Sequence, residues 1–287
     1  MPQGGSNSQF YMERLPTDIG SIGAFAMGEL NEKHLAPKAE LIRDAARAQP
    51  KPYEDMWRFL SMCLPENLRH IHPSRWKKLI QISADDAVSL TWAPSPEVIT
   101  ALLEISSSDD RVEILEAHRD EIQADVITSL DKVAHPHLKN AVRLLRAAVR
   151  ASGSGHFEAA QALAANVLET LMTSHGNSWV RQAFPEFRPS GSGHYRTLIE
   201  VLTSDMEWRH RSVDDLVRFL VVVGLGDVFG PDDVQLTFNR HLAAHRASEY
   251  SYQPHFALSA LLLTHGLLRA LDADMTPPEQ RALPWGW

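Results

Sequence analysis

The sequence contains very little cysteine, and this scarcity excludes several kinds of site. Cys63 is the single cysteine among 287 residues, so the chain can form neither an internal disulfide nor a zinc site built on several cysteine ligands. Its apolar neighbours predict a buried packing residue rather than a catalytic nucleophile. We therefore expect a reducing compartment and no cysteine chemistry.

Positive charge is also in short supply. The chain has 28 Lys and Arg against 36 Asp and Glu, a net charge of −8, which disfavours tight, non-specific binding to a phosphate backbone. Any contact with RNA must therefore be local. Basic residues do cluster within residues 69–78 and along one helix side at Arg143, Arg146 and Arg150. Solvated helix faces would explain both clusters.

The sequence lacks long hydrophobic runs and a signal-peptide pattern. Its longest apolar stretches, FLVVVGLG and FALSALLLTHGLL, are shorter than the roughly 20 residues that span a membrane. The N-terminal MPQGGSNSQF does not show the basic and then apolar order of a secretory signal. We therefore expect a cytoplasmic protein with no membrane span of its own.

Strand-type alternation is missing, whereas helical periodicity runs through most of the chain. Ser95 and Pro96 predict an N-cap and first helical position, followed by a face of Val98, Leu102 and Ile105. A helical pattern then runs on until Pro136 breaks it. Beyond that proline, the spacing predicts further helices over residues 138–149, 157–171, 212–223, 230–245 and 253–271. The predicted fold class is all-α.

The length and the break at Pro136 together predict two helical parts. A chain of 287 residues exceeds the typical domain of roughly 100–200 residues. The predicted organisation is a flexible N-terminus, a helical region of unknown role, a second helical domain and a C-terminal tail, at residues 1–20, 21–135, 136–275 and 276–287.

One short stretch, FNRHLAAH at residues 238–245, concentrates the polar chemistry. On a helix, Phe238, His241 and His245 share a stripe, so both histidines would face the core or a partner. Arg240 would lie roughly 140° around the helix from His245. The two side chains would share a target only if Arg240 curled across the helix or a second copy supplied it.

These residue types suit metal-independent cleavage of RNA. A histidine near the end of a helix is favoured as imidazolium by the helix dipole. His245 could therefore act as acid or base on a ribose 2′-hydroxyl or a leaving 5′-oxygen, while the Arg240 guanidinium neutralises charge on the phosphate.

Two other interpretations of the stretch stay open. The first is a buried structural histidine beside a surface arginine. The second is a metal site, because His241, His245 and Glu249 follow one another at four-residue steps. The zinc-protease helix needs a glutamate directly after its first histidine, and this chain has Leu242 there.

The segment NRHLAAH, followed by SEY and the apolar HFALSALLLTHGLLRAL, resembles the signature segment of HEPN domains, especially those of abortive-infection-type proteins. Arg240 and His245 match the two defining positions of that family, and His241 matches the polar position after the arginine. Asn239 precedes the arginine as in many members. The resemblance covers roughly residues 136–275.

The resemblance implies an antiparallel helical bundle that dimerises, so that two facing motifs form one composite RNA-cleaving site. It implies His245 as the general acid or base, Arg240 as the phosphate clamp, and Asn239 and His241 as the groups that orient them. Many relatives carry glycine where this chain has Arg246, which either narrows the cleft or adds a phosphate contact. Glu249 completes the set of candidate supporting residues.

The function implied by this resemblance is a metal-independent endoribonuclease that acts as a toxin or phage-defence effector. We expect no cofactor and no metal, RNA as the substrate, a homodimer, and an antitoxin or co-encoded effector protein as a further partner. The alternative is a non-catalytic HEPN-like module that binds or senses and works through a protein partner.

Overall fold

The computed structural model describes five stretches of the chain and one isolated residue, namely 61–176, 178–179, 213–226, 228, 238–239 and 251–276. The predicted flexible N-terminus at 1–20, residues 21–60 of the predicted helical region, and all but the first residue of the predicted tail at 276–287 lie outside these residues. Ser212, the first residue of the helix predicted over 212–223, also lies outside them.

Helices account for the regular structure of the described residues, and none of these residues forms a strand. The prediction of an all-α fold is confirmed at this level. The α-helices are α5 (Trp76–Asp85), α6 (Pro96–Glu104), α7 (Ser108–Ala117), α8 (Arg119–Leu130), α9 (Lys139–Gly153), α10 (Phe157–Leu171), α13 (Val213–Leu225) and α15 (Pro254–Met275). Short helical turns are η1 (Glu66–Leu68), η2 (Pro73–Arg75), η3 (Pro136–Leu138) and the π-helical η4 (Met172–Gly176).

Helix α6 begins where its sequence predicts. The Ser95 side chain accepts a hydrogen bond from the Val98 backbone N–H at 3.4 Å, and Pro96 occupies the first turn, where a missing N–H costs nothing. Val98 and Leu102 are fully buried. Ile105, the third predicted core residue, caps the helix and is only half-buried.

Helices α9 and α10 form an antiparallel pair joined by a glycine turn. Gly155 has a φ of 80°, a left-handed conformation that glycine adopts without strain. The His156 N–H donates to the Ala151 carbonyl across this turn at 2.9 Å. The helix predicted over residues 138–149 is therefore present, and it runs on to Gly153, where this turn begins.

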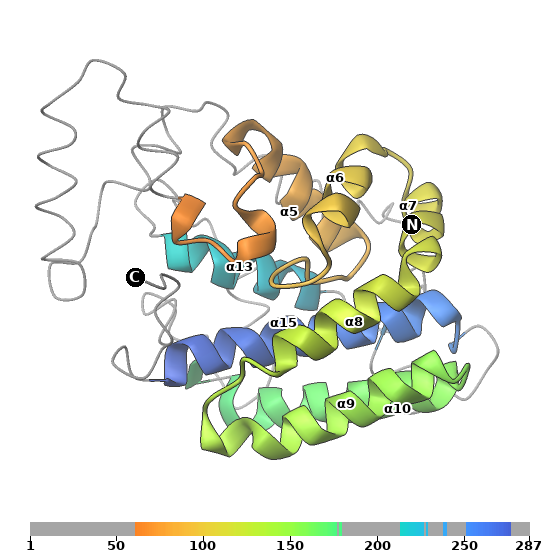
Figure 1. Cartoon of the computed structure of the whole chain (residues 1–287), viewed down its shortest axis with the longest axis vertical. Coiled ribbons are helices and arrows are strands. Elements are labelled where there is room, and N and C mark those ends of the chain that lie inside the picture. Colours follow the sequence, from red (N-terminus) through yellow and green to blue (C-terminus); the bar gives the residue numbers. More distant parts are fainter. Residues whose placement is uncertain are drawn as a thin grey trace, which may run out of the picture.

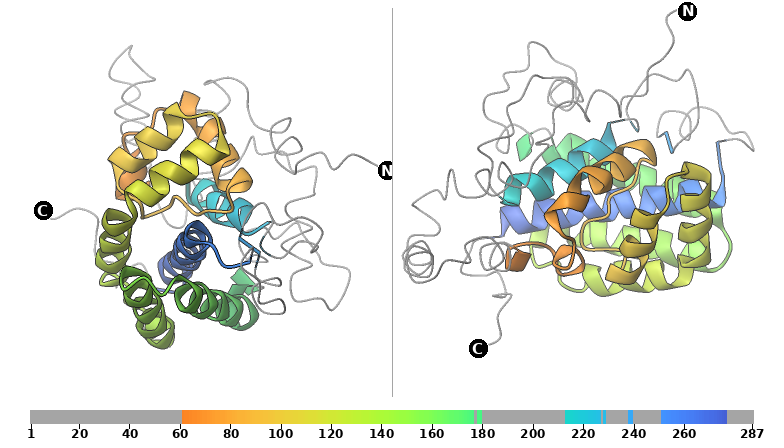
Figure 2. Two further views of the ribbon diagram at one scale, coloured as in Figure 1. Left: turned by 90° about the vertical axis from the view of Figure 1, so that its right-hand side faces the viewer. Right: turned by 90° about the horizontal axis from the view of Figure 1, so that it is seen from above.

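Helix α15 is the central element of the fold. It contacts α7, α8, α9, α10 and α13, and Figures 1 and 2 show it running through the middle of the helices that surround it. By length and composition alone it could cross a membrane, but 89% of its most apolar window is buried inside the protein. Its long apolar run is accounted for by this position in the core.

The hydrophobic core is continuous across residue 135. One cluster of buried side chains includes residues from Leu64 to Leu130 and from Leu138 to Leu271. Helix α13 packs against α5, and α15 packs against α7 and α8, so contacts between the two predicted parts are numerous. Within the described residues, the predicted boundary at 135 marks a break in the helical pattern and not a break in the core.

Two local predictions are wrong. The pattern that runs through residues 109–133 is divided at His118, which ends α7 and precedes α8 with a φ of −99° and a ψ of 15°. In both helices, apolar and polar residues are poorly separated into faces. The sequence pattern therefore does not reveal the corner between them. Cys63 is exposed rather than buried, because the backbone has left the helix at this residue while Leu64 turns into the core.

A buried segment without regular structure, residues 87–94, lies against α15. The Asn67 side chain satisfies its backbone by donating to the Leu90 and Pro94 carbonyls at 3.0 and 2.8 Å and accepting from the Trp92 N–H at 3.0 Å. Ser89 and Thr91 share a 2.7 Å hydrogen bond between their buried hydroxyls. The absence of a side chain on Gly266 of α15 makes room for them.

The Gly266→Ala variant is expected to be destabilised by about 1–3 kcal/mol, although alanine is the better helix former. A Cβ atom at residue 266 would lie 2.0 Å from the Oγ and 2.5 Å from the Cβ of Ser89. Gly266 and Ser89 are both buried. Urea unfolding would measure the loss. Adding Ser89→Gly, which removes both clashing atoms, should recover part of it, and a Gly266→Ala protein as stable as wild type would contradict this packing.

Candidate functional site

The predicted site residues lie almost entirely outside the described part of the chain. This applies to Arg240, His241, His245, Arg246 and Glu249. Asn239 is described: it is buried, with 6% of its surface exposed, and it follows the fully buried Phe238. The structure therefore brings the first residue of the motif to the core and leaves the arrangement of the others a prediction.

The helix predicted over residues 230–245 does not run through Phe238 and Asn239, which have no helical hydrogen-bonding pattern. Thr237, Phe238 and Asn239 are a β-branched, an aromatic and an amide residue, all weak helix formers. Both described residues are buried, Phe238 at 0% and Asn239 at 6% exposure. The stripe that linked Phe238 to His241 and His245 required an unbroken helix, so that part of the prediction is wrong.

The chain is anchored to the core on both sides of the motif. Before it, Phe238 is among the largest fully buried side chains of the protein. After it, the carbonyl of the buried Ser251 accepts a 2.7 Å hydrogen bond from the Gln161 amide of α10. Helix α15 then begins at Pro254. The described residues that flank Arg240 and His245 in the chain, Asn239 and Ser251, are thus both buried in the helical bundle.

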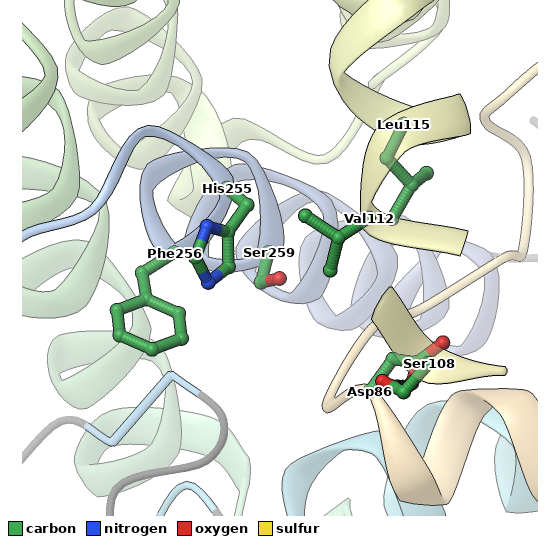
Figure 3. A pocket seen from close by; sticks show the side chains of 7 residues that line it. All are labelled: Asp86, Ser108, Val112, Leu115, His255, Phe256 and Ser259. Carbon is green, nitrogen blue, oxygen red and sulfur yellow. Dashed lines mark hydrogen bonds between the residues drawn. The ribbon is translucent and has the colours of Figure 1, made fainter. Parts of the chain in front are cut away.

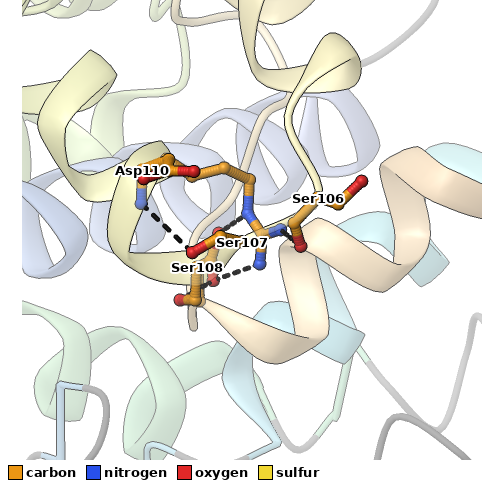
Figure 4. A network of polar contacts seen from close by, with 6 residues as sticks. Ser106, Ser107, Ser108 and Asp110 are labelled. Atoms are coloured by element: carbon orange, nitrogen blue, oxygen red, sulfur yellow. Dashed lines mark hydrogen bonds and ion pairs between the residues drawn. The ribbon is translucent and has the colours of Figure 1, made fainter.

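A buried ion pair between Asp86 and Arg111 fixes the end of α5 to α7. The Arg111 Nε and one terminal nitrogen donate to the two Asp86 oxygens at 2.5 and 2.7 Å, and its other terminal nitrogen donates to the Ser106 carbonyl at 2.9 Å. The Ser108 hydroxyl also donates to Asp86, at 2.6 Å. Figure 4 shows this network, in which Ser107 caps α7 by accepting from the Asp110 N–H.

A small recess lies beside this ion pair, between α7 and the first turns of α15 (Figure 3). Its lining consists of Asp86, Ser108, Val112, Leu115, His255, Phe256 and Ser259. Burial lowers the pKa of His255, and the charge of Glu116 opposes this shift. Arg111 and Ser108 engage both Asp86 oxygens. The carboxylate that meets His255 is that of Glu116, whose Oε1 lies 4.0 Å from the His255 Nδ1 and which also pairs with Arg119.

His265, in the middle of α15, is fully buried, and neither of its ring nitrogens has a hydrogen-bond partner. Burial, and secondarily the charge of Arg269, lowers its pKa to about 3. The imidazole is therefore neutral near pH 7. It cannot supply a proton to a substrate, and we assign it to packing.

Stability is expected to fall between pH 6.5 and about 3 because of His265. Its folded pKa of about 3 lies below the unfolded value of about 6.5, so the unfolded chain binds the extra proton in that window. The stabilisation is complete above the unfolded pKa, and about 2–3 kcal/mol should be lost by pH 4.5. Urea unfolding of wild type and His265→Leu across this pH range would isolate the contribution of His265 to the free energy of unfolding. Equal pH dependence in both would contradict it.

Sequence reasoning missed the Asp86–Arg111 pair and the role of Asp272. The Asp272 carboxylate, on the last turns of α15, accepts hydrogen bonds from the Ala134 and His135 backbone N–H groups at 3.0 and 2.8 Å. It thereby ties the loop before η3 to the central helix. Both interactions join residues far apart in the chain, and a pattern of local spacing carries no signal for them.

The described residues contain no group of three or more His, Cys, Asp or Glu side chains that could hold a metal ion. His241, His245 and Glu249 lie outside them, so the metal interpretation of that triplet stays untested. The chain matches no family model, and no curated protein and no solved structure matches it.

Proposed function

We propose that this chain is a metal-independent endoribonuclease whose site is built on residues 239–245. The observation that carries the proposal is the anchoring of this segment: Phe238 before it and its first residue Asn239 are buried, and Ser251 after it is held by Gln161. Catalysis requires reacting groups held in a fixed geometry. A short segment tethered at both ends to a packed helical core meets that requirement better than a free loop.

In the proposed reaction, one His245 imidazole takes the proton from a ribose 2′-hydroxyl. The resulting oxygen attacks the adjacent phosphorus, and the bond to the 5′-oxygen breaks. A second imidazole, His245 of another copy, protonates this leaving oxygen, and Arg240 neutralises the charge that accumulates on the phosphate. The products are a 2′,3′-cyclic phosphate and a free 5′-hydroxyl. Asn239 and His241 orient these groups.

The proposed biological role is that of a toxin or phage-defence effector, with an antitoxin or a co-encoded effector as a further partner. The composite site requires a homodimer. Light scattering at micromolar concentration should therefore give twice the mass of the 287-residue chain. A monomer that cleaves RNA would remove the composite site from the proposal and leave the nuclease.

The test is incubation of the purified protein with total RNA and with tRNA in excess chelator. Cleavage that leaves 2′,3′-cyclic phosphate ends is expected. A folded dimer that leaves both RNAs intact, and gains no activity on addition of divalent metals, would overturn the nuclease proposal. That result would favour the non-catalytic module. The net charge of −8 is also compatible with such a module, because it does not have to bind RNA of every sequence.

A further inference from the structure

Helix α9 carries a row of four cations on the face that it turns away from the core. They are Lys139, Arg143, Arg146 and Arg150, at spacings of four, three and four. With 100° per residue, they lie within an arc of roughly 60° and extend about 16 Å along the helix axis. No acidic residue occurs anywhere in α9. We call these four residues the α9 stripe.

The α9 stripe is largely free of the acids that neutralise cations elsewhere in this acidic chain. Arg146 pairs with Asp131. Arg143 bonds only the neutral Asn140 side chain, at 3.0 Å, and within the described residues Lys139 and Arg150 have no ion-pair partner. Lys139, Arg143 and Arg150 are exposed. By contrast, the half-buried Arg75 of η2 is held by the exposed Glu104.

Exposed residues on α9 are all polar or glycine, namely Lys139, Asn140, Arg143, Arg150 and Gly153. Protein interfaces bury an apolar centre, and this surface offers none. Guanidinium groups bind phosphate oxygens through paired N–H donors. At roughly 3.4 Å per nucleotide, the stripe matches about five phosphates of a stacked strand. Its chemistry therefore fits a nucleic-acid backbone better than an acidic protein surface.

We infer that the α9 stripe is the surface on which this protein holds the phosphate backbone of single-stranded RNA. The inference deepens the proposed nuclease function and rests on it for the identity of the substrate. Helix α9 lies on the side of the molecule opposite α5 and α6 (Figure 1). It packs directly against α10 and α15, the helices that contribute Gln161 and follow the motif in the chain. The stripe thus supplies the local positive surface that the overall charge of −8 does not.

The test measures binding of a labelled 20-nucleotide oligo-uridine by fluorescence anisotropy, in chelator and over a range of salt, with His245→Ala protein so that no cleavage intervenes. Arg143→Gln/Arg150→Gln is expected to weaken binding about tenfold or more, and to reduce the slope of log K against log salt by about 1.4. Lys77→Gln/Lys78→Gln on α5 removes two charges elsewhere and should leave binding within about twofold. Circular dichroism and thermal melting confirm that each variant is folded.

Three results would overturn the inference: unchanged binding by Arg143→Gln/Arg150→Gln, an equal loss in the α5 pair, or displacement of the RNA by polyglutamate as effectively as by unlabelled RNA. The last would assign the stripe to an acidic protein partner. The experiments distinguish failure of the α9 stripe inference from failure of the nuclease proposal. Stripe-dependent binding by a protein that never cleaves would sink the nuclease alone, and cleavage with stripe-independent binding would sink this inference alone.

Discussion

The His245→Ala variant is expected to cleave RNA at least about 100-fold more slowly than wild type, because a positioned imidazole contributes about 10²–10⁴-fold to a reaction of this kind. Arg240→Ala should lose a similar factor, since its guanidinium stabilises charge that exists only in the transition state. The losses should not add in the double variant, because the two groups act on the same step. Single-turnover cleavage of tRNA in chelator measures all three rates.

The matched control for this prediction is His156→Ala. His156 is an exposed histidine in the turn between α9 and α10, and its removal should leave cleavage unchanged. Adding an excess of His245→Ala protein to wild type should inhibit cleavage, because a mixed dimer keeps only one of the two His245 imidazoles that the composite site uses. Full activity in His245→Ala would refute its role, and undiminished cleavage in the mixture, with subunit exchange verified, would refute the composite site.

Sequence reasoning identified the helices whose signals are local. Helix α6 has a serine cap and a first-turn proline, α9 has a buried face that includes Leu145 and Val149 and a terminal glycine turn, and α15 has a continuous apolar run. In each case, capping chemistry and the 3.6-residue period fall within one short window. Tertiary contacts were not needed to predict these elements.

The features that sequence reasoning missed depend on contacts between distant residues. The irregular segment 87–94 is stable in the core because Asn67, more than 20 positions earlier in the chain, bonds its backbone at three points. Phe238 and Asn239 are buried without helical structure, although the pattern over residues 230–245 predicts a helix there. Cys63 has apolar neighbours yet is exposed. Packing decided each of these outcomes over local propensity.

The candidate site was predicted from the sequence alone, and the structure describes Asn239 and the residues that flank the motif. The side chains proposed to react, Arg240 and His245, were chosen by residue type, spacing and resemblance. The hydrogen bond from Gln161 to Ser251 and the burial of Asn239 could not be derived that way. Both depend on contacts between described segments that lie far apart in the chain, which a local pattern does not contain.

The Arg111→Ala variant is expected to be destabilised by about 3–5 kcal/mol, because it leaves the Asp86 carboxylate buried without its counter-charge. The two side chains are only 5% and 4% exposed, so water cannot replace the lost donors. Ser108 alone would remain to bond the carboxylate. Urea unfolding at pH 7 would measure the difference.

Arg75→Ala is the matched control for burial, since Arg75 and Glu104 also meet at 2.7 Å but are 35% and 64% exposed. Screening by water should keep its effect to about 1 kcal/mol or less. The double variant Asp86→Leu/Arg111→Leu should be more stable than Arg111→Ala, because it buries no charge at all. Equal losses in Arg111→Ala and Arg75→Ala would show that burial does not set the strength of the Asp86 pair. The junction of α5 with α7 would then depend on its apolar contacts alone.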